Sequence, residues 1–410
     1  MAVTAETAYL FRHALLRDAA YELQLPKARA RLHLLAADIL EAMPEAGTLL
    51  AREIADHLRL AAVDKADRAT RAREERFAAL AAGHADASFK LLEAVVLWQR
   101  VAELSPDRKA DALRHAGRAA LQYGLPVAES LLKSALKCAD TERDERAKAH
   151  ACGSMANLYQ QIGRLDDALA YHERAIKISR DLGSREFEGV QVGNIANLYF
   201  RQGRLAEAEA AHESALAIHR EQGNRKNEAV TLGNLAGVLQ KLGRMEEAER
   251  LFEQSISLLK QSGELRSYAI AMANFGNFLA DGMRLEQSRR VLTEALRLVR
   301  ESGNHRFEGN VQGSLGLLYC MLGQPHEGMP RLALACAIHQ EVQNWGSLVH
   351  HGLRLALWQL ATGDNAAARM QWKKSALHAQ EHGQLALVAD LRPAMLQDCE
   401  RAGVPPLDPA

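Results

Sequence analysis

The sequence predicts an all-α protein, a solenoid built from helix-turn-helix units. Three observations support this fold class. The phrase NLYQQIGRL at 157–165 returns 40 residues later as NLYFRQGRL at 197–205, glycines recur on a 20-residue grid, and aromatic residues make up only 5% of the chain. An apolar set dominated by Ala and Leu favours helix over sheet. A fixed period of this size indicates units that bury their apolar faces only against their neighbours.

The composition indicates which kinds of partner the protein can bind and in which cellular compartment it occurs. The chain has 410 residues with 51 basic and 51 acidic side chains, so its formal net charge is zero and gives no overall attraction to nucleic acid or an anionic membrane. No apolar run approaches the roughly 18 residues of a membrane helix, and the N-terminus does not resemble a secretory signal. Five cysteines without C-x-x-C spacing argue against disulfides and zinc. We therefore predict a cytoplasmic protein without nucleic-acid or membrane partners.

Residues 1–60 are expected to form helices. Leu10, Leu15 and Ala19 recur at helical spacing, and Pro26 separates them from an amphipathic helix that carries Leu32, Leu35, Ile39 and Leu40.

The sequences at 10–41 and 50–61, LFRHALLRDAAYELQLPKARARLHLLAADILE and LAREIADHLRLA, resemble the helical region that follows the nucleotide-binding core of bacterial STAND-type ATPases. That family carries a G-x-x-x-x-G-K-[ST] loop in the upstream core. No such loop occurs in this sequence, so ATP binding is not carried over. The resemblance implies a fragment of a larger switch protein, or a descendant that has lost its ATPase core.

Residues 61–106 are expected to be a linker and a degenerate helical hairpin. The charged run of mixed sign at 62–76 suggests a solvated helix face or a linker. In the stretch 77–106, Ala94, Trp98 and Val101 are spaced to face a neighbouring helix, and Pro106 should end that helix.

From residue 107 to 385 the 40-residue period predicts about seven helix-turn-helix units. Two glycines per period close amphipathic segments of about 17 residues, and glycine suits the left-handed residue that ends a helix. The grid contains Gly163, Gly183, Gly203, Gly223, Gly243, Gly263, Gly303, Gly323, Gly363 and Gly383. Two grid positions lack glycine: Met283, which follows Gly282, and Gln343.

Small and large residues stay in step within these units, which lets two helices approach closely while a bulky side chain fills the gap. The small residues form three rows: Ala116, Ala156, Ala196, Ala236, Gly276, Gly316 and Ala356; then Ala128, Ala168, Ala208, Ala248, Ser288, Gly328 and Ala368; then Ala135, Ala175, Ala215, Ser255, Ala295, Ala335 and Ser375. Between the last two rows lie Leu132, His172, His212, Phe252, Leu292, Leu332 and Trp372.

This pattern resembles the tetratricopeptide repeat (TPR), in the long 40-residue form of the Pins/LGN cell-polarity adaptors and, more distantly, of kinesin light chain. The resemblance implies a right-handed TPR superhelix. Glu188, Glu228 and Glu308 keep the family pattern, and we expect Arg185 and Arg225 to form surface pairs of little energetic value with the first two. Residues 386–410 are expected to supply a capping helix and a frayed tail, VPPLDPA.

No catalytic motif is present, so we predict neither an enzyme nor a cofactor. The 16 histidines raise the question of a metal site. However, the adjacent pair His350–His351 cannot chelate by itself, since neighbouring helix residues point about 100° apart. His172, His212, His219 and His339 occupy recurring positions and are expected to be packing residues, so no metal site is predicted.

A binding role is favoured instead, with a protein or peptide ligand held in the concave groove. The candidate peptide-binding residues are Ser154, Asn157, Asn194, Asn197, Arg201, Asn234, Lys241, Asn274, Asn277 and Ser314. Asparagine amides both donate and accept hydrogen bonds. In Pins/LGN-like proteins, the resemblance implies that such an asparagine ladder holds the partner peptide. Alternatively, these amides only satisfy neighbouring helices or water.

Two further hypotheses concern the basic residues beside the asparagines and the function of the whole protein. Arg201 and Lys241 suggest a partner with an acidic segment. The function we predict is a peptide-binding scaffold in bacterial signalling or complex assembly. The alternative is the sensor half of a STAND-type switch that controls a cyclase, kinase or transcription regulator. The oligomeric state is left open.

Overall fold

The computed structural model describes residues 21–44, 47, 49–62, 68–88, 90–124 and 126–408. Over these residues the chain is helical and contains no strand, which confirms the all-α prediction. The chain divides into two compact units, Met1–Ala151 and Cys152–Ala410. The expected helix through Leu10, Leu15 and Ala19 lies outside the described residues. None of the described helices combines the length and the apolarity needed to cross a membrane.

In the first unit each helix packs against the next one along the chain. Proline stands at the first turn of α2, where its missing N–H costs nothing, and α5 ends two residues before Pro106. Ala94, Trp98 and Val101 are buried, as their spacing predicts. The helices are α2 (Pro26–Glu41), α3 (Ala51–Ala61), α4 (Arg68–Ala87), α5 (Leu91–Leu104), η1 (Pro106–Arg108), α6 (Lys109–Tyr123) and α7 (Ala128–Glu142).

The charged run at 62–76 is more than a solvated face. Its residues from Arg68 onward belong to α4, and Glu74 within them is only 1% exposed. Arg100 Nε, on α5, donates a hydrogen bond to Glu74 Oε1 at 2.7 Å. The guanidinium offsets the cost of taking this carboxylate out of water, so the charge helps to join two helices.

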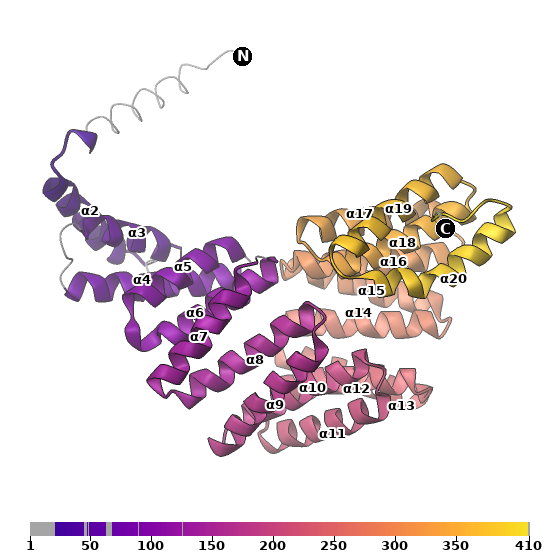
Figure 1. Cartoon of the computed structure of the whole chain (residues 1–410), viewed down its shortest axis with the longest axis horizontal. Coiled ribbons are helices and arrows are strands. Elements are labelled where there is room, and N and C mark those ends of the chain that lie inside the picture. The colour runs from indigo at the N-terminus through magenta and orange to yellow at the C-terminus, as the bar shows by residue number, and fades with distance from the viewer. Residues whose placement is uncertain are drawn as a thin grey trace, which may run out of the picture. The chain divides into compact units, whose positions relative to one another are not determined.

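The helix α8 (Glu145–Gln161) crosses the boundary between the units, and the second unit continues with strictly alternating helices (Figure 1). We call the first helix of each pair the A helix and the second the B helix. The A helices are α10 (Arg185–Arg201), α12 (Arg225–Lys241), α14 (Leu265–Asp281), α16 (His305–Met321) and α18 (Trp345–Ala361). The B helices are α9 (Leu165–Asp181), α11 (Leu205–Glu221), α13 (Met245–Ser262), α15 (Leu285–Glu301), α17 (Pro325–Glu341) and α19 (Asn365–Glu381), and α20 (Leu385–Ala402) ends the series.

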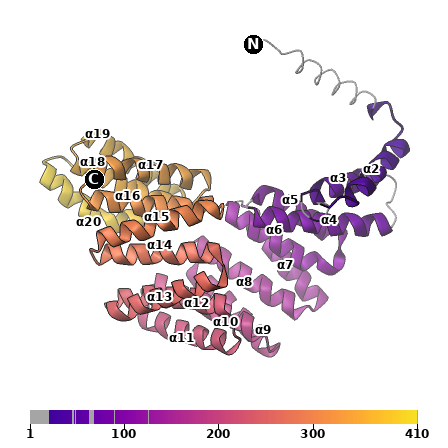
Figure 2. The same ribbon diagram turned by 180° about the vertical axis from the view of Figure 1, so that it is seen from behind.

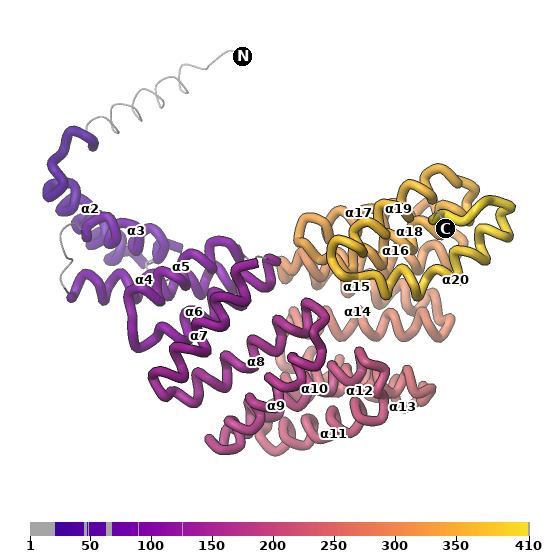
Figure 3. Tube along the Cα trace, viewed as in Figure 1, coloured from indigo at the N-terminus to yellow at the C-terminus, as the bar shows by residue number. Residues whose placement is uncertain are grey.

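The turns confirm the glycine grid, and their tight course is visible in the tube of Figure 3. All ten grid glycines have positive φ, between 63° and 87°. Each closes a helix in the left-handed conformation: Gly223 N donates to Arg220 O and Asn224 N to His219 O, the two bonds of a Schellman turn. At the grid positions without glycine, Met283 and Gln343 adopt the same conformation with φ of 57° and 52°, whereas Gly282 keeps a negative φ. The left-handed turn therefore forms at every grid position, even where the residue has a side chain that disfavours a positive φ.

Packing inside the second unit follows the predicted rows. The bulky residues His172, His212, Phe252, Leu292, Leu332 and Trp372 are all buried, together with the small residues around them. A Cβ added at Gly316 would lie 2.8 Å from Leu332 Cγ and 2.9 Å from Gly328 O, so α16 and α17 approach closely through their glycines. Apolar clusters join an A helix, its B helix and the next A helix, as Leu235, Phe252 and Phe278 do across α12, α13 and α14.

The A helices form one layer of the second unit. α12 packs against α10 and α14, and α16 packs against α14 and α18, whereas α11 and α13 pack mainly between the A helices on either side. The front and back views agree with this stacking order (Figures 1 and 2). Because successive A helices contact one another more than successive B helices do, the A helices form one continuous layer of this unit, which we call the A layer.

The glutamates of the family pattern differ from expectation. Glu188 is 2% exposed and Glu228 is 5% exposed, so these are not surface pairs. Arg180 Nε at 2.6 Å and Arg185 Nη1 at 2.6 Å both donate to Glu188. Arg180 lies in the last turn of α9 and Arg185 begins α10, so the buried carboxylate joins two helices. Sequence spacing predicts the partner at i−3 but cannot show the second arginine or the burial.

The C-terminal tail also differs from expectation, because residues 404–408 are docked rather than frayed. The helix α20 places Met395 and Cys399 against α18 and α19, as a capping helix should. Leu407 is buried in the same cluster, and Arg369 Nη1 donates to Pro406 O at 2.8 Å. One apolar side chain and one arginine thus hold a segment whose composition suggests disorder.

Candidate functional site

Two adjoining hollows in the second unit are lined mainly by residues of the A helices. The smaller hollow, of about 280 Å³, is lined by Asn197, Phe200, Gly233, Asn234, Gly237, Gln240, Phe252, Asn274 and Asn277. The larger hollow, of about 540 Å³, is lined by Ala273, Asn274, Asn277, Phe307, Asn310, Val311, Ser314, Asn344, Gly346, Ser347, His350, His351, Gln384 and Leu387. Asn274 and Asn277 line both, so the two hollows form one continuous path, which we call the amide groove.

The amide groove brings together half of the predicted site residues. Asn197 on α10, Asn234 on α12, Asn274 and Asn277 on α14, and Ser314 on α16 all line it. Asn197 and Asn277 hold one repeat position of the A helices, and Asn234, Asn274 and Ser314 hold another. Asn274 and Asn277 are exposed. Residues that recur at the repeat period in the sequence therefore lie one after another along the groove.

The other predicted residues line neither hollow. Ser154 on α8 is buried, and Asn157 on the same helix is exposed. Asn194 is half-buried on α10. Arg201 is exposed and its Nη1 donates to Gln160 O at 3.0 Å, which ties α10 to the end of α8, and Lys241 is exposed at the end of α12.

Sequence reasoning missed the residues that widen the larger hollow. Asn310 and His350 stand four residues before Ser314 and Arg354 on their A helices, at a position that holds Val190, Val230 and Ile270 in earlier units. The signal was present in the sequence, because this apolar row becomes polar in the last two units. Asn344 comes from the turn before α18 and Ser347 from its first turn, and Asn224 and Asn304 hold the same repeat position as Asn344.

The lining of the amide groove carries no acidic or basic side chain other than histidine. Burial lowers the pKa of His351 to about 3 and also lowers the pKa of His350, so both imidazoles are uncharged at pH 7. The His351 ring stacks on His339 with centroids 5.2 Å apart, and its Nε2 occupies the space beside Gly313, where a Cβ would collide with it. The groove is therefore neutral, rich in amides and interrupted by apolar side chains.

The four histidines at recurring positions, His172, His212, His219 and His339, are buried packing residues, as the sequence predicts. His172 Nδ1 lies 2.8 Å from Gln191 Oε1, and burial lowers the pKa of His172 to about 4. His219 and His339 fill the space left by glycines: a Cβ on Gly189 would lie 2.9 Å from His219 Cε1, and one on Gly309 would lie 2.7 Å from His339 Cε1. Their recurrence reflects contact between neighbouring units.

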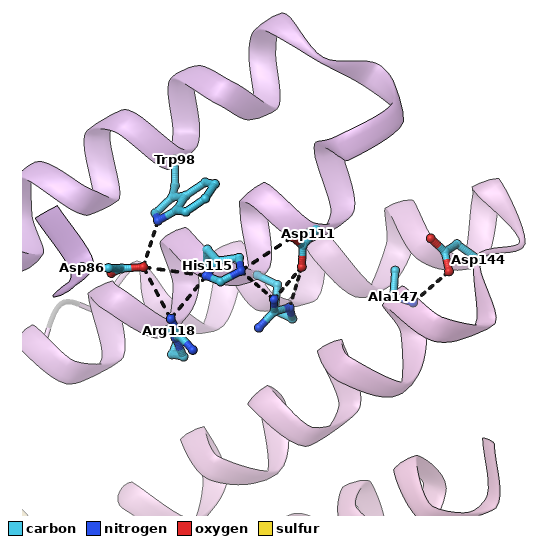
Figure 4. A network of polar contacts seen from close by, with 8 residues as sticks. Asp86, Trp98, Asp111, His115, Arg118, Asp144 and Ala147 are labelled. Carbon is cyan, nitrogen blue, oxygen red and sulfur yellow. Dashed lines mark hydrogen bonds and ion pairs between the residues drawn. The ribbon is translucent and has the colours of Figure 1, made fainter. Parts of the chain in front are cut away.

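The first unit holds a dense polar network across α4, α5 and α6 (Figure 4). Trp98 Nε1 donates to Asp86 Oδ2 at 3.0 Å, and the Trp98 ring stacks on His115 at 4.5 Å. His115 lies between two carboxylates, 3.7 Å from Asp86 and 3.6 Å from Asp111. Burial raises the pKa of Asp86, but hydrogen bonds from His115 and Trp98 and the charge of Arg118 outweigh it and lower the pKa overall. Since these side chains are hydrogen-bonded or ion-paired with one another, the network has a structural role and holds α4, α5 and α6 together.

Comparison with known proteins agrees with this architecture. Residues 189–261 match a family model described as Tetratricopeptide repeat, and residues 151–186 match a second model of the same description. The chain is thus a TPR-containing helical-repeat protein. A search of curated proteins gave no significant match.

Three solved structures share the fold. A Rap protein complexed with Competence and Sporulation Factor is 14% identical, with a TM-score of 0.56 over 80% of this chain and 92% of that one. The apo quorum sensor NprR from B. thuringiensis is 15% identical, with a TM-score of 0.54 over 81% and 93%. A STAND protein with a tetratricopeptide repeat sensor from Pyrococcus horikoshii is 15% identical, with a TM-score of 0.51, and the match covers 86% of this chain but 56% of that one. At these identities the similarity concerns the fold alone.

Proposed function

We propose that this protein is a non-catalytic cytoplasmic scaffold that binds an extended, uncharged peptide segment of a partner in the amide groove. The observation that supports this proposal is the composition of the groove lining, in which asparagine, glutamine and serine side chains recur and charged side chains do not. The fold is compatible with such a role, since similar structures include a Rap protein solved with a bound factor and a quorum sensor.

The amides match the needs of a peptide backbone. Each backbone unit offers one N–H and one C=O, and an asparagine amide can accept from the first and donate to the second. Packed helices lie about 8–10 Å apart, whereas an extended chain advances about 3.3 Å per residue, so each A helix meets about every third residue of the ligand. A row of amides with this spacing would bind the backbone of the ligand and make no specific contact with most of its side chains.

The lack of charge in the groove selects against charged ligands. A buried carboxylate or ammonium group without a partner costs several kcal/mol. Phe200 and Phe307 line the groove and offer apolar contacts, and the open side of Gly237, where a Cβ would touch nothing within 4 Å, leaves room for a ligand side chain. Arg201 and Lys241 stay candidates for contacts outside the hollows, where an acidic flank of the ligand would meet them.

A selection from a random peptide library tests this function. We expect peptides enriched on the wild-type chain to carry uncharged central segments, and we expect no such enrichment on an Asn274→Ala/Asn277→Ala variant. Asn365→Ala, which removes an exposed asparagine on the B helix α19, is the matched control and should select the same peptides as wild type. Enrichment of acidic or basic segments by the wild type would reject the uncharged ligand.

A second candidate function is the sensor half of a STAND-type switch. It is favoured by the resemblance of the sequences at 10–41 and 50–61 to the region that follows the STAND core. In this case the groove ligand would control an attached or associated ATPase. Sequencing the gene upstream of the Met1 codon tests this: a reading frame that continues into a phosphate-binding loop supports the switch, and its absence favours the independent scaffold.

A further inference from the structure

A cluster of metal-ligating side chains lies outside the amide groove, at the C-terminal end of α19. His378, Glu381 and His382 follow the spacing i, i+3 and i+4, which places all three on one face of the last helical turn. One ligand atom from each lies within 4.8 Å of the other two. No other group of three histidine, cysteine or acidic side chains in the described part of the chain meets this condition.

The distances inside the cluster fit shared coordination better than direct hydrogen bonding. His378 Nδ1 and Glu381 Oε2 are 3.5 Å apart, which is too long for a strong hydrogen bond. Two ligands of a tetrahedral zinc ion, each about 2.1 Å from the metal, lie about 3.4 Å apart. The His378 Nδ1 atom is itself buried and has no hydrogen-bond partner among the described residues. A metal ion between the two side chains would satisfy it.

Trp345, the first residue of α18, covers one side of the cluster. Its ring lies parallel to the His382 ring, with centroids 3.9 Å apart and an interplanar angle of 2°, and 6.0 Å from the His378 ring. The indole restricts both imidazoles and gives the site an apolar wall, and such a shell helps to orient metal ligands. The opposite side is open, because the Glu381 side chain is 51% exposed.

We propose that His378, Glu381 and His382 form a binding site for a divalent transition-metal ion. Two imidazole nitrogens and one carboxylate oxygen suit Zn²⁺, Cu²⁺ or Ni²⁺, and are a poor match for Ca²⁺ or Mg²⁺, which prefer oxygen ligands. Solvent would supply the fourth ligand on the open side. None of its three ligands lines the amide groove.

Metal titration of the full chain, purified without a histidine tag and treated with a chelator, tests the site. Isothermal titration with Zn²⁺ is expected to give one site per chain. Titration with Cu²⁺ should quench the tryptophan fluorescence in step, because Trp345 stacks directly on a ligand. The double variant His378→Ala/His382→Ala and the single variant Glu381→Gln should each bind at least about 10-fold more weakly. A Trp345→Phe variant should keep Zn²⁺ binding and lose part of the Cu²⁺ quenching.

The chain offers a matched control in His305→Ala. His305 also contacts two carboxylates, Glu308 and Glu341 at 3.4 Å each, but through different ring nitrogens, so it cannot chelate one ion with both. This variant should bind metal as the wild type does. Circular dichroism verifies that each variant is folded, and Glu381→Gln, an exposed and conservative change, tests the site if the double variant unfolds. Wild-type affinity in both ligand variants, or no binding of Zn²⁺ and Cu²⁺ by the wild type, overturns the proposal.

Discussion

At the residue scale, single backbone angles and single buried charges determine the junctions between helices. The turn glycines accept positive φ without strain, but Met283 and Gln343 hold the same angle with a side chain attached. An L-residue in the left-handed region costs about 1–2 kcal/mol. These two turns therefore lower the stability of their repeats relative to the turns that contain glycine.

Replacing Gln343 by glycine should relieve this strain. We expect Gln343→Gly to raise the free energy of unfolding by about 0.5–1 kcal/mol, less than the full strain because glycine also increases the entropy of the unfolded chain. Urea denaturation followed by circular dichroism measures the change. Gln343→Ala, which keeps a Cβ at the same φ, is the control and should not be stabilised. A loss of stability in the glycine variant would contradict the strain.

The buried carboxylate of Glu188 should make stability depend on pH. Burial raises the pKa of Glu188, but hydrogen bonds from Arg180 and Arg185 outweigh it, so the folded-state pKa lies below the ordinary value of 4.5. A lowered pKa contributes stability that is present above the ordinary value and is lost as pH falls through the folded-state value. We expect Glu188→Gln to cost about 1–3 kcal/mol at pH 7 and distinctly less at pH 3.

Glu207→Gln is the matched control for this prediction. Glu207 is an exposed glutamate paired with Arg204 on the surface, so its replacement should change stability little at either pH. Chemical denaturation of the wild type and both variants at pH 7 and pH 3 measures the differences. Equal costs for Glu188→Gln at the two pH values would show that the buried ion pair does not stabilise the fold.

At the scale of the element, α16 and α17 pack closely through two glycines. A Cβ on Gly328 would lie 2.5 Å from Gly316 O and closer still to Cys320 Sγ, so this crossing leaves no room for a methyl group. The predicted small-residue rows explain the contact, because both glycines occupy positions that hold alanine in most other units. The sequence thus predicts where helices meet, and the packing determines how closely.

Gly328→Ala should destabilise the protein despite the better helix propensity of alanine. Overpacking costs about 1–3 kcal/mol, which exceeds the gain of about 1 kcal/mol in propensity. Gly237→Ala is the matched control: this helical glycine has open space around its Cα, so alanine should stabilise it by about 0.5–1 kcal/mol. Thermal denaturation of both variants should give melting temperatures on opposite sides of the wild type, and a higher value for Gly328→Ala would refute the close contact.

At the scale of the whole molecule, the helical-repeat fold was largely predictable and the lining of the candidate groove only in part. The 40-residue period predicted amphipathic segments of about 17 residues closed at the grid positions, and α10 and α12 are 17-residue helices that end just before Gly203 and Gly243. It also led to the candidates Asn197, Asn234 and Asn277, which line the amide groove. It could not predict the docked tail or the second arginine on Glu188, since both depend on contacts between residues that the repeat does not relate.

The central claim is that the amide groove binds an uncharged peptide through its asparagines. The most direct test is fluorescence anisotropy with a labelled peptide obtained by selection on the wild-type chain. We expect Asn274→Ala/Asn277→Ala to weaken the affinity at least about 10-fold, since two buried hydrogen bonds are worth about 1–3 kcal/mol together. Charge reversal of Arg201 and Lys241 should weaken the affinity less, by about 2-fold, because both lie outside the groove and would meet only an acidic flank of the ligand. Affinity lost on charge reversal and kept in the asparagine variant would contradict this account.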